Sequence, residues 1–113
     1  MPPVLSVHFY RTAAGKEPVR NWLIDKLTPA AKKVIGMDIK TVQLGWPMGM
    51  PLVRKMTPGL WEIRSRIPEG IARVFFTLAN RRLVLLHGFV KKSQATPRAD
   101  IELALHRMKE VGT

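Results

Sequence analysis

Cysteine is absent from the 113 residues of this chain, which therefore has no disulfide framework, no thiolate metal site and no thiol nucleophile. Long apolar runs are absent too, since none approaches the ~18 residues needed to cross a membrane. The apolar stretch 1–9 lacks the basic segment and the cleavage site of a signal peptide. We therefore expect a cytoplasmic protein with no membrane association.

Common catalytic motifs are also missing. Three serines are present, but none lies in a G-x-S-x-G elbow, and the chain has no Walker loop. The histidines have no metal-ligand spacing, so we expect each of them to be structural and expect neither a metal nor another cofactor. They are His8, His87 and His106.

Acidic residues are scarce. Asp and Glu number 8 against 19 Lys and Arg, which gives a formal net charge of +11, and the sequence pI is about 11.0. Such a charge on a short chain favours a polyanionic partner, because basic side chains release counterions from a phosphate backbone. The simpler alternative is a basic surface that only keeps the protein soluble.

The rest of the composition is that of a folded protein, and the length fits one domain over residues 1–113. Its N-terminal half predicts a strand followed by a helical hairpin. Val4–Tyr10 is β-branched and aromatic, which is typical of a strand. Two helical patterns follow, one over Pro18–Leu27 and one over Pro29–Val42 with Thr28 as its N-cap. Two glycines and two prolines within Gly45–Pro51 predict a loop.

After this loop the hydrophobic period changes from about 3.6 residues to about 2, which predicts strands joined by short turns. The strands are expected at Val53–Met56, Leu60–Ile67, Ile71–Ala79 and Arg82–Val90. Short connections make them antiparallel, and the unbroken apolar run 83–86 indicates a strand covered on both faces. A last helix begins at Thr96-Pro97. The expected fold is therefore α+β, with a βαα opening, an antiparallel β-meander and a C-terminal helix.

Basic side chains concentrate on the meander and beside it. A two-residue turn at Pro68-Glu69 pairs Arg64 with Arg73 and keeps one face of the sheet apolar and the other charged. Opposed like charges lower stability, so we expect an anionic ligand on the charged face. The basic residues of this region are Arg54, Lys55, Arg64, Arg66, Arg73, Lys91, Lys92 and Arg98.

The same register, carried across the Asn80-Arg81 turn, pairs Gly88 with Arg73 and places His87 on the apolar face. Gly88 would then leave room for a phosphate chain to approach closely. Arg73 is expected at an exposed mid-strand position, where replacement by alanine changes stability little. His87 becomes the leading general acid or base only if this assignment of faces is wrong.

Three stretches resemble the phage-derived branch of the RelE/HigB-like toxins. They are LWEIR at Leu60–Arg64, ARVFF at Ala72–Phe76 and LLHGFVKKSQATP at Leu85–Pro97. The resemblance extends over nearly the whole chain, including the βαα opening and the last helix. It implies a RelE-like fold and an endoribonuclease that cuts messenger RNA in the decoding site of the ribosome. It also implies a neutralising antitoxin, for which a HigA-like helix-turn-helix protein is the expected kind.

Carried over by position, the resemblance gives catalytic roles to Arg64, Arg73, Lys91 and Lys92, and it matches Lys55 as an RNA contact. Arg54, Arg66 and Arg98 join Lys55 as expected RNA contacts because of their placement beside the meander. RNA carries its own nucleophile, the 2′-hydroxyl, so that basic residues need only align it and stabilise the developing charge. No metal is needed for such a reaction. The chain departs from many relatives at Glu62, where they have a second basic residue, and it lacks a tyrosine that some have near the position of Arg98.

Two alternatives belong to other functional classes. A ParE-like toxin of the same fold would inhibit DNA gyrase without cutting RNA, but the group of Arg64, Arg73 and Lys91-Lys92 argues against it. A basic module without catalytic activity would bind nucleic acid with strong salt dependence and leave it whole.

Overall fold

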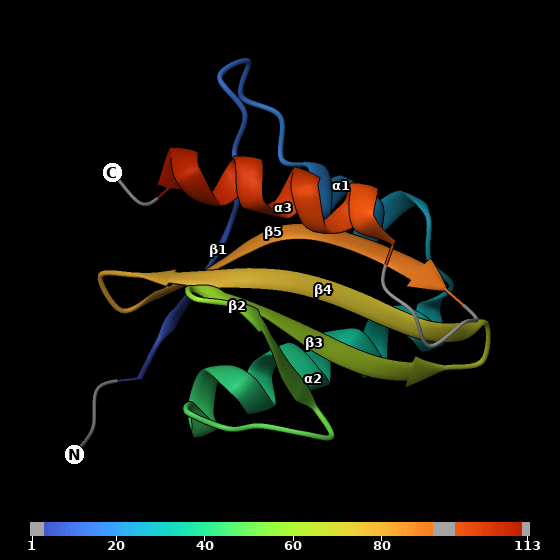
Figure 1. Ribbon diagram of the computed structural model, residues 1–113. Helices are drawn as coiled ribbons and strands as arrows, with labels where there is room; N and C mark the ends of the chain where they lie inside the picture. Colours follow the sequence, from blue (N-terminus) through green and yellow to red (C-terminus); the bar gives the residue numbers. More distant parts are fainter. Residues whose placement is uncertain (1–3, 92–96, 112–113) are drawn as a thin grey trace.

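The computed structural model describes residues 4–91 and 97–111 and has the predicted α+β class and element order (Figure 1). The elements are β1 (Ser6–Phe9), α1 (Pro18–Asp25), α2 (Pro29–Gly45), β2 (Val53–Thr57), β3 (Leu60–Ile67), β4 (Gly70–Ala79), β5 (Arg82–Lys91) and α3 (Arg98–Val111). Pro97 directly precedes α3, and Thr96, with which the last helix was expected to begin, lies outside the described residues. None of the described helices combines the length and the apolar character needed to cross a bilayer.

The strands form one sheet in the order β1-β5-β4-β3-β2. β2, β3, β4 and β5 make the predicted antiparallel meander. β1 pairs in parallel with β5, so the first and last strands of the chain lie side by side. The edges of the sheet are therefore β1 and β2.

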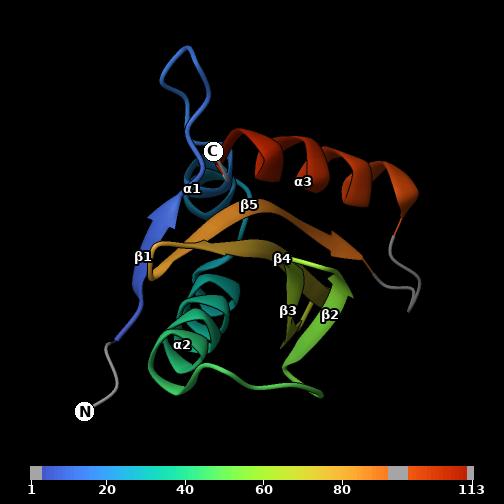
Figure 2. The ribbon, with the colours of Figure 1, turned by 60° about the vertical axis from the view of Figure 1, so that its left-hand side comes forward.

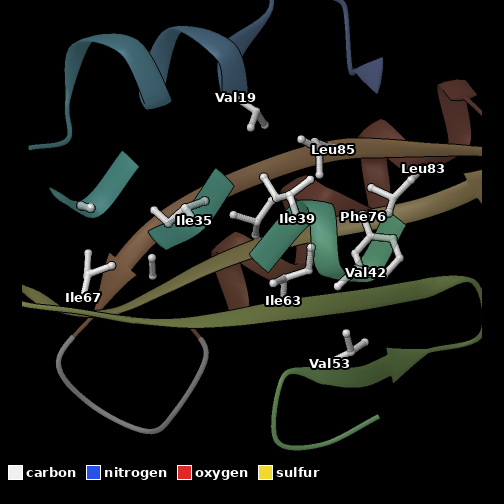
Figure 3. Packing of buried hydrophobic residues seen from close by; sticks show 13 residues of the cluster. Val19, Ile35, Ile39, Val42, Val53, Ile63, Ile67, Phe76, Leu83 and Leu85 are labelled. Atoms are coloured by element: carbon white, nitrogen blue, oxygen red, sulfur yellow. The ribbon is translucent and has the colours of Figure 1, made fainter. Parts of the chain in front are cut away.

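Helices cover both faces of this sheet, with α2 and α3 on opposite sides (Figure 2). One face, here called the hairpin face, packs on the helical hairpin of α1 and α2, and Figure 3 shows the cluster between them. The other face, here called the α3 face, packs a smaller cluster under α3 that includes Phe75, Leu86 and Ala104. The run Leu83–Leu86 contributes to both clusters and is at most 4% exposed, which confirms a strand covered on both sides.

The start of α2 follows from its first residues. Thr28 is the N-cap, and its hydroxyl oxygen accepts a hydrogen bond of 3.2 Å from the Ala31 amide. Pro29 suits the first helical turn because that turn needs no amide donor there. Ala31, Ile35, Ile39 and Val42 then recur every three or four residues and are all buried on the hairpin face. The predicted amphipathic helix is confirmed.

The predicted pairing of β3 with β4 is confirmed, with Arg64 opposite Arg73 and Ile63 opposite Val74. The pairing of β4 with β5 begins in the predicted register after the Asn80-Arg81 turn and then shifts. Phe76 pairs with Leu85 but Phe75 pairs with His87, so Leu86 is an extra residue in a β-bulge. The expectation that Gly88 pairs with Arg73 is therefore wrong, since Phe89 occupies that place and Gly88 pairs with Val74.

Gly88 makes room for a side chain of the protein and not for a ligand. A Cβ atom at this position would lie 2.6 Å from Cε3 of Trp22, an indole on α1, and closer still to its Cζ3 atom. Gly88 therefore faces the hairpin, and the close packing of α1 on β5 depends on its missing side chain.

Gly88→Ala is expected to destabilise the protein by about 1–3 kcal/mol, because an added methyl group overpacks a filled site. Urea unfolding followed by circular dichroism measures this change. Gly36→Ala in α2 is the matched control, since a Cβ there meets nothing within 4 Å. It should stabilise the protein by up to about 1 kcal/mol through helix propensity. Equal effects of the two substitutions would contradict the packing of Trp22 on Gly88.

Candidate active site on the α3 face

Strand register brings most of the predicted basic residues to one face. Residues paired across neighbouring strands point to the same face of the sheet. Arg54 therefore shares a face with Glu62 and Phe75. Arg64 shares the same face with Arg73 and Phe89. Phe75 and Phe89 belong to the cluster under α3, which fixes this face as the α3 face. The next pairing along the strands joins Arg66, Ile71 and Lys91. We call Arg54, Arg64, Arg66, Arg73 and Lys91 the basic face.

Three predicted residues lie apart from the basic face. Lys55 pairs with Trp61, whose ring packs against the hairpin-face cluster, so Lys55 is on the opposite side of the sheet from Arg54. Arg98 is on the first turn of α3 with its side chain 91% exposed, and its Nε lies 3.0 Å from Glu102 Oε1. Lys92 lies outside the described residues.

Glu62 forms the centre of a buried ion cluster on the basic face. Its Oε1 atom lies 3.4 Å from Nη1 of Arg73 and 3.7 Å from Nε of Arg64. The side chains of Glu62 and Arg73 have no exposed surface, whereas that of Arg64 is 16% exposed. One carboxylate thus lies between two opposed guanidinium groups and offsets much of their mutual repulsion.

This cluster corrects the expectation for Arg73. The residue is on the charged face, as predicted, but its position is fully buried and not exposed. Glu62, at the position where many relatives were expected to have a second basic residue, supplies a buried counterion for the opposed arginines. Arg73 holds the Glu62 carboxylate in place, and that carboxylate in turn contacts Arg64, whose side chain reaches the surface.

Arg73→Ala should lower the free energy of unfolding by roughly 3–5 kcal/mol, because it removes a cation from a fully buried carboxylate. Arg66→Ala, an exposed arginine on the same strand pair, should change it by only ~0.5 kcal/mol. Urea unfolding measures both. The double variant Arg73→Met with Glu62→Leu should recover much of the loss, since the fully buried cation and the fully buried carboxylate are then removed together. An Arg73→Ala protein as stable as Arg66→Ala would show that Arg73 is exposed.

His87 is the functional candidate that the sequence analysis placed on the wrong face. Its imidazole lies on the α3 face against two rings that also contact each other, with centroid distances of 6.3 Å to Phe75 and 5.5 Å to Phe89. Nε2 is 2.6 Å from Oδ1 of Asp100 in the first turn of α3. The two side chains are 17% and 24% exposed, so this pair is packed but reaches the surface.

The Leu86 bulge is the cause of this placement. Leu86 and His87 both lie on the α3 face, because the extra residue interrupts the alternation of side chains along β5. The carbonyl of Leu86 accepts a hydrogen bond of 2.8 Å from Nη1 of Arg107 on α3. The bulged backbone therefore has a partner on the same helix that supplies Asp100.

Arg107 is itself held in place by a further contact. Its guanidinium lies 5.2 Å from the centroid of the Tyr10 ring, and the Tyr10 hydroxyl donates a 3.0 Å hydrogen bond to Oε1 of Glu110. Burial raises the pKa of the Tyr10 phenol, and the hydrogen bond to Glu110 and the negative charge of that residue raise this pKa further. The phenol therefore remains a neutral donor at physiological pH, and it fastens the C-terminal half of α3 to the sheet.

The arrangement provides a proton carrier beside a cationic surface. An ionised carboxylate can only accept hydrogen bonds, so Asp100 accepts one from Nε2–H, and in the neutral form of the imidazole Nδ1 is then the proton acceptor. Arg64 and His87 are on the same face but on β3 and β5, with β4 between them. Their backbone positions are separated by two residues along the strands, about 7 Å, and by two strand spacings across them, about 10 Å. A phosphodiester held by the long Arg64 side chain can therefore lie near the imidazole.

The sequence is similar to a known protein family. The family model described as phage derived protein Gp49-like (DUF891) matches residues 22–109, which is most of the chain. No curated protein matches the sequence significantly. The match extends from α1 to α3 and so includes both the basic face and the pair of His87 and Asp100.

The chain therefore belongs to the Gp49-like family of phage-derived proteins. This family is part of the RelE/HigB-like superfamily of toxins, whose members are related to toxin–antitoxin systems. The superfamily implies an antitoxin as the partner of this chain.

Proposed function

We propose that this protein is a ribosome-dependent endoribonuclease, the toxin of a type II toxin–antitoxin pair, and that it stops translation in the cytoplasm by cutting messenger RNA. The observation that carries the proposal is the 2.6 Å pair of His87 and Asp100, which is packed at the surface beside the basic face. Geometry of this kind supports general base catalysis, whereas a protein that only binds nucleic acid needs no oriented imidazole.

In the proposed reaction, Nδ1 of His87 takes the proton of the ribose 2′-hydroxyl as the 2′-oxygen attacks the neighbouring phosphorus. The bond from phosphorus to the 5′-oxygen breaks, and the departing oxygen takes a proton from water. The hydroxide that this leaves takes the proton back from the His87 imidazolium. The products are a 2′,3′-cyclic phosphate and a 5′-hydroxyl. Asp100 stabilises the imidazolium that forms and keeps the ring in its orientation, as a carboxylate does in a catalytic triad.

Arg64 is the proposed electrostatic catalyst. Its forked guanidinium matches phosphate oxygens and can stabilise the extra negative charge of the transition state. The buried carboxylate of Glu62, 3.7 Å from Nε of Arg64, limits where that side chain can lie. Lys91, Arg66 and Arg54 are proposed to contact flanking phosphates, and Arg98 on α3 is proposed to extend this set. An RNA contact by Lys92 remains a proposal from the sequence alone.

This chemistry needs no metal ion or cofactor, because the nucleophile belongs to the RNA and the cations are side chains. We propose that the ribosome supplies the alignment of the messenger RNA. Positive charge at +11 favours association with ribosomal RNA.

The antitoxin is proposed to be a HigA-like helix-turn-helix protein that places acidic side chains against the basic face. Opposite charge accelerates capture of a toxin and screens its RNA-binding surface.

His87→Gln should lower the rate of messenger RNA cleavage on programmed ribosomes by about 10²–10⁴, the usual contribution of a general base. His106→Gln is the matched control, because this histidine also lies on the α3 side and is 3.4 Å from a carboxylate, that of Glu110, but its side chain is 74% exposed. It should cleave like the wild type. Primer extension gives the rates, and analysis of the 3′ ends should find cyclic phosphate or 3′-phosphate.

Growth experiments separate the alternatives. His87→Gln, expressed without antitoxin at wild-type levels, should no longer stop growth. If it stays fully toxic while messenger RNA remains intact and a DNA-damage response appears, the protein is a gyrase inhibitor. Tight, salt-sensitive RNA binding by the wild type without any cleavage would instead identify a binding module.

A further inference from the structure

A small hollow opens beside the basic face where β3 extends past its neighbour. β2 pairs with β3 only as far as Ile63, and beyond that point the loop before β2 flanks the strand. The Arg64 amide donates a 2.8 Å hydrogen bond to the Leu52 carbonyl and so fixes this loop against β3. The hollow, here called the Arg66 hollow, has a volume of about 180 Å³ and is lined by Met50, Pro51, Arg64, Arg66 and Ile71.

The lining combines apolar side chains with guanidinium groups. Met50 is 59% exposed and Ile71 is half-buried, so the apolar walls are accessible. Splayed nucleobases in protein complexes of single-stranded RNA lie on flat or apolar side chains and on Arg guanidinium planes. Methionine is suited to such contacts because its thioether is flexible and polarisable. The Arg66 hollow therefore has the chemistry of a base-binding pocket.

The size of the hollow limits what it can hold. Its volume of about 180 Å³ is a little larger than the ~150 Å³ of an engineered protein cavity that binds one benzene molecule. One planar nucleobase fits this space, whereas a base together with its sugar and phosphate does not. The sugar and phosphate of a bound nucleotide must then lie outside, over the exposed Arg66 side chain.

A second hollow next to it is a poorer candidate. Both hollows are lined by Pro51, Arg64 and Arg66. The second hollow is also lined by residues of α2, and one of these is Asp38. The carboxylate of Asp38 would repel a phosphate at this position. Charge therefore favours a path of the RNA over the Arg66 hollow, on the α3 side of the strand.

We propose that the Arg66 hollow binds one nucleobase of the RNA, next to the phosphate that Arg64 contacts, with Met50 and Ile71 as apolar walls and Arg66 stacked on the base. Arg64 lines the hollow and also belongs to the candidate active site, so one residue connects the two. The proposal deepens the proposed ribonuclease function on which it rests, because it identifies a site at which the identity of a neighbouring base affects cleavage.

Methyl-group NMR of the whole protein tests this proposal without any cleavage reaction. The probes are uridine monophosphate and adenosine monophosphate, with inorganic phosphate as the base-free control. Ring currents of a stacked base should shift the Met50 and Ile71 methyl signals in a saturable way, and inorganic phosphate should not. Met37 on α2 is the internal control, since it is 60% exposed and does not line the hollow.

Arg66→Ala should weaken nucleotide binding measured at these methyl groups by about ten-fold, in line with the loss of one stacking contact. Arg20→Ala removes an equal charge from an exposed position on α1 and should leave the binding unchanged. The proposal is overturned if Met50 and Ile71 do not shift, if phosphate alone shifts them equally, or if Met37 shifts as much. Such a failure, in a protein that still cleaves messenger RNA, would leave the proposed function standing.

Discussion

The Leu86 bulge in β5 is the feature on which the candidate site depends. Without the extra residue, strict alternation would direct His87 toward α1 and Gly88 toward the arginines. With it, Gly88 receives the indole of Trp22 on the hairpin face, and His87 meets Asp100 on the α3 face. Arg107 completes this arrangement because its bond to the Leu86 carbonyl joins the bulge to the helix that carries Asp100. One backbone irregularity thus sets both the packing of α1 and the position of the proposed base.

The buried cluster around Glu62 has a related role for the cations. Two arginines on adjacent strands would repel one another, and Glu62 lies between them with a fully buried carboxylate. Breaking such a cluster is costly, since each charge inside relies on the others for its solvation. The buried part of Arg64 is therefore held by Glu62 while its side chain reaches the surface, which suits the proposed role of this residue in stabilising a transition state.

Much of this molecule could be predicted from its sequence because local patterns determine it. The helices and strands follow from local signals such as the Thr28 cap, the helical spacing from Ala31 to Val42 and the two-residue turns. The register of β3 with β4 follows from the burial of Ile63 opposite Val74. The bulge could not be predicted, because Leu85 and Leu86 are equally apolar and both faces of β5 are covered, so neither arrangement exposes a leucine. The complete burial of Arg73 could not be predicted either, because alternation along a strand gives the face of a side chain but not how much of it is covered. The single error in register misplaced both His87 and Gly88.

The position of the His87 ring is the most direct test of this account. A two-dimensional NOE spectrum of the protein with its aromatic signals assigned should show contacts from the His87 ring protons to the rings of Phe75 and Phe89, whose centroids lie 6.3 and 5.5 Å away. It should show none to the Trp22 indole. Contacts from His87 to Trp22, without those to the two phenylalanines, would mean an unbulged strand and would contradict both the proposed base and the site built around it.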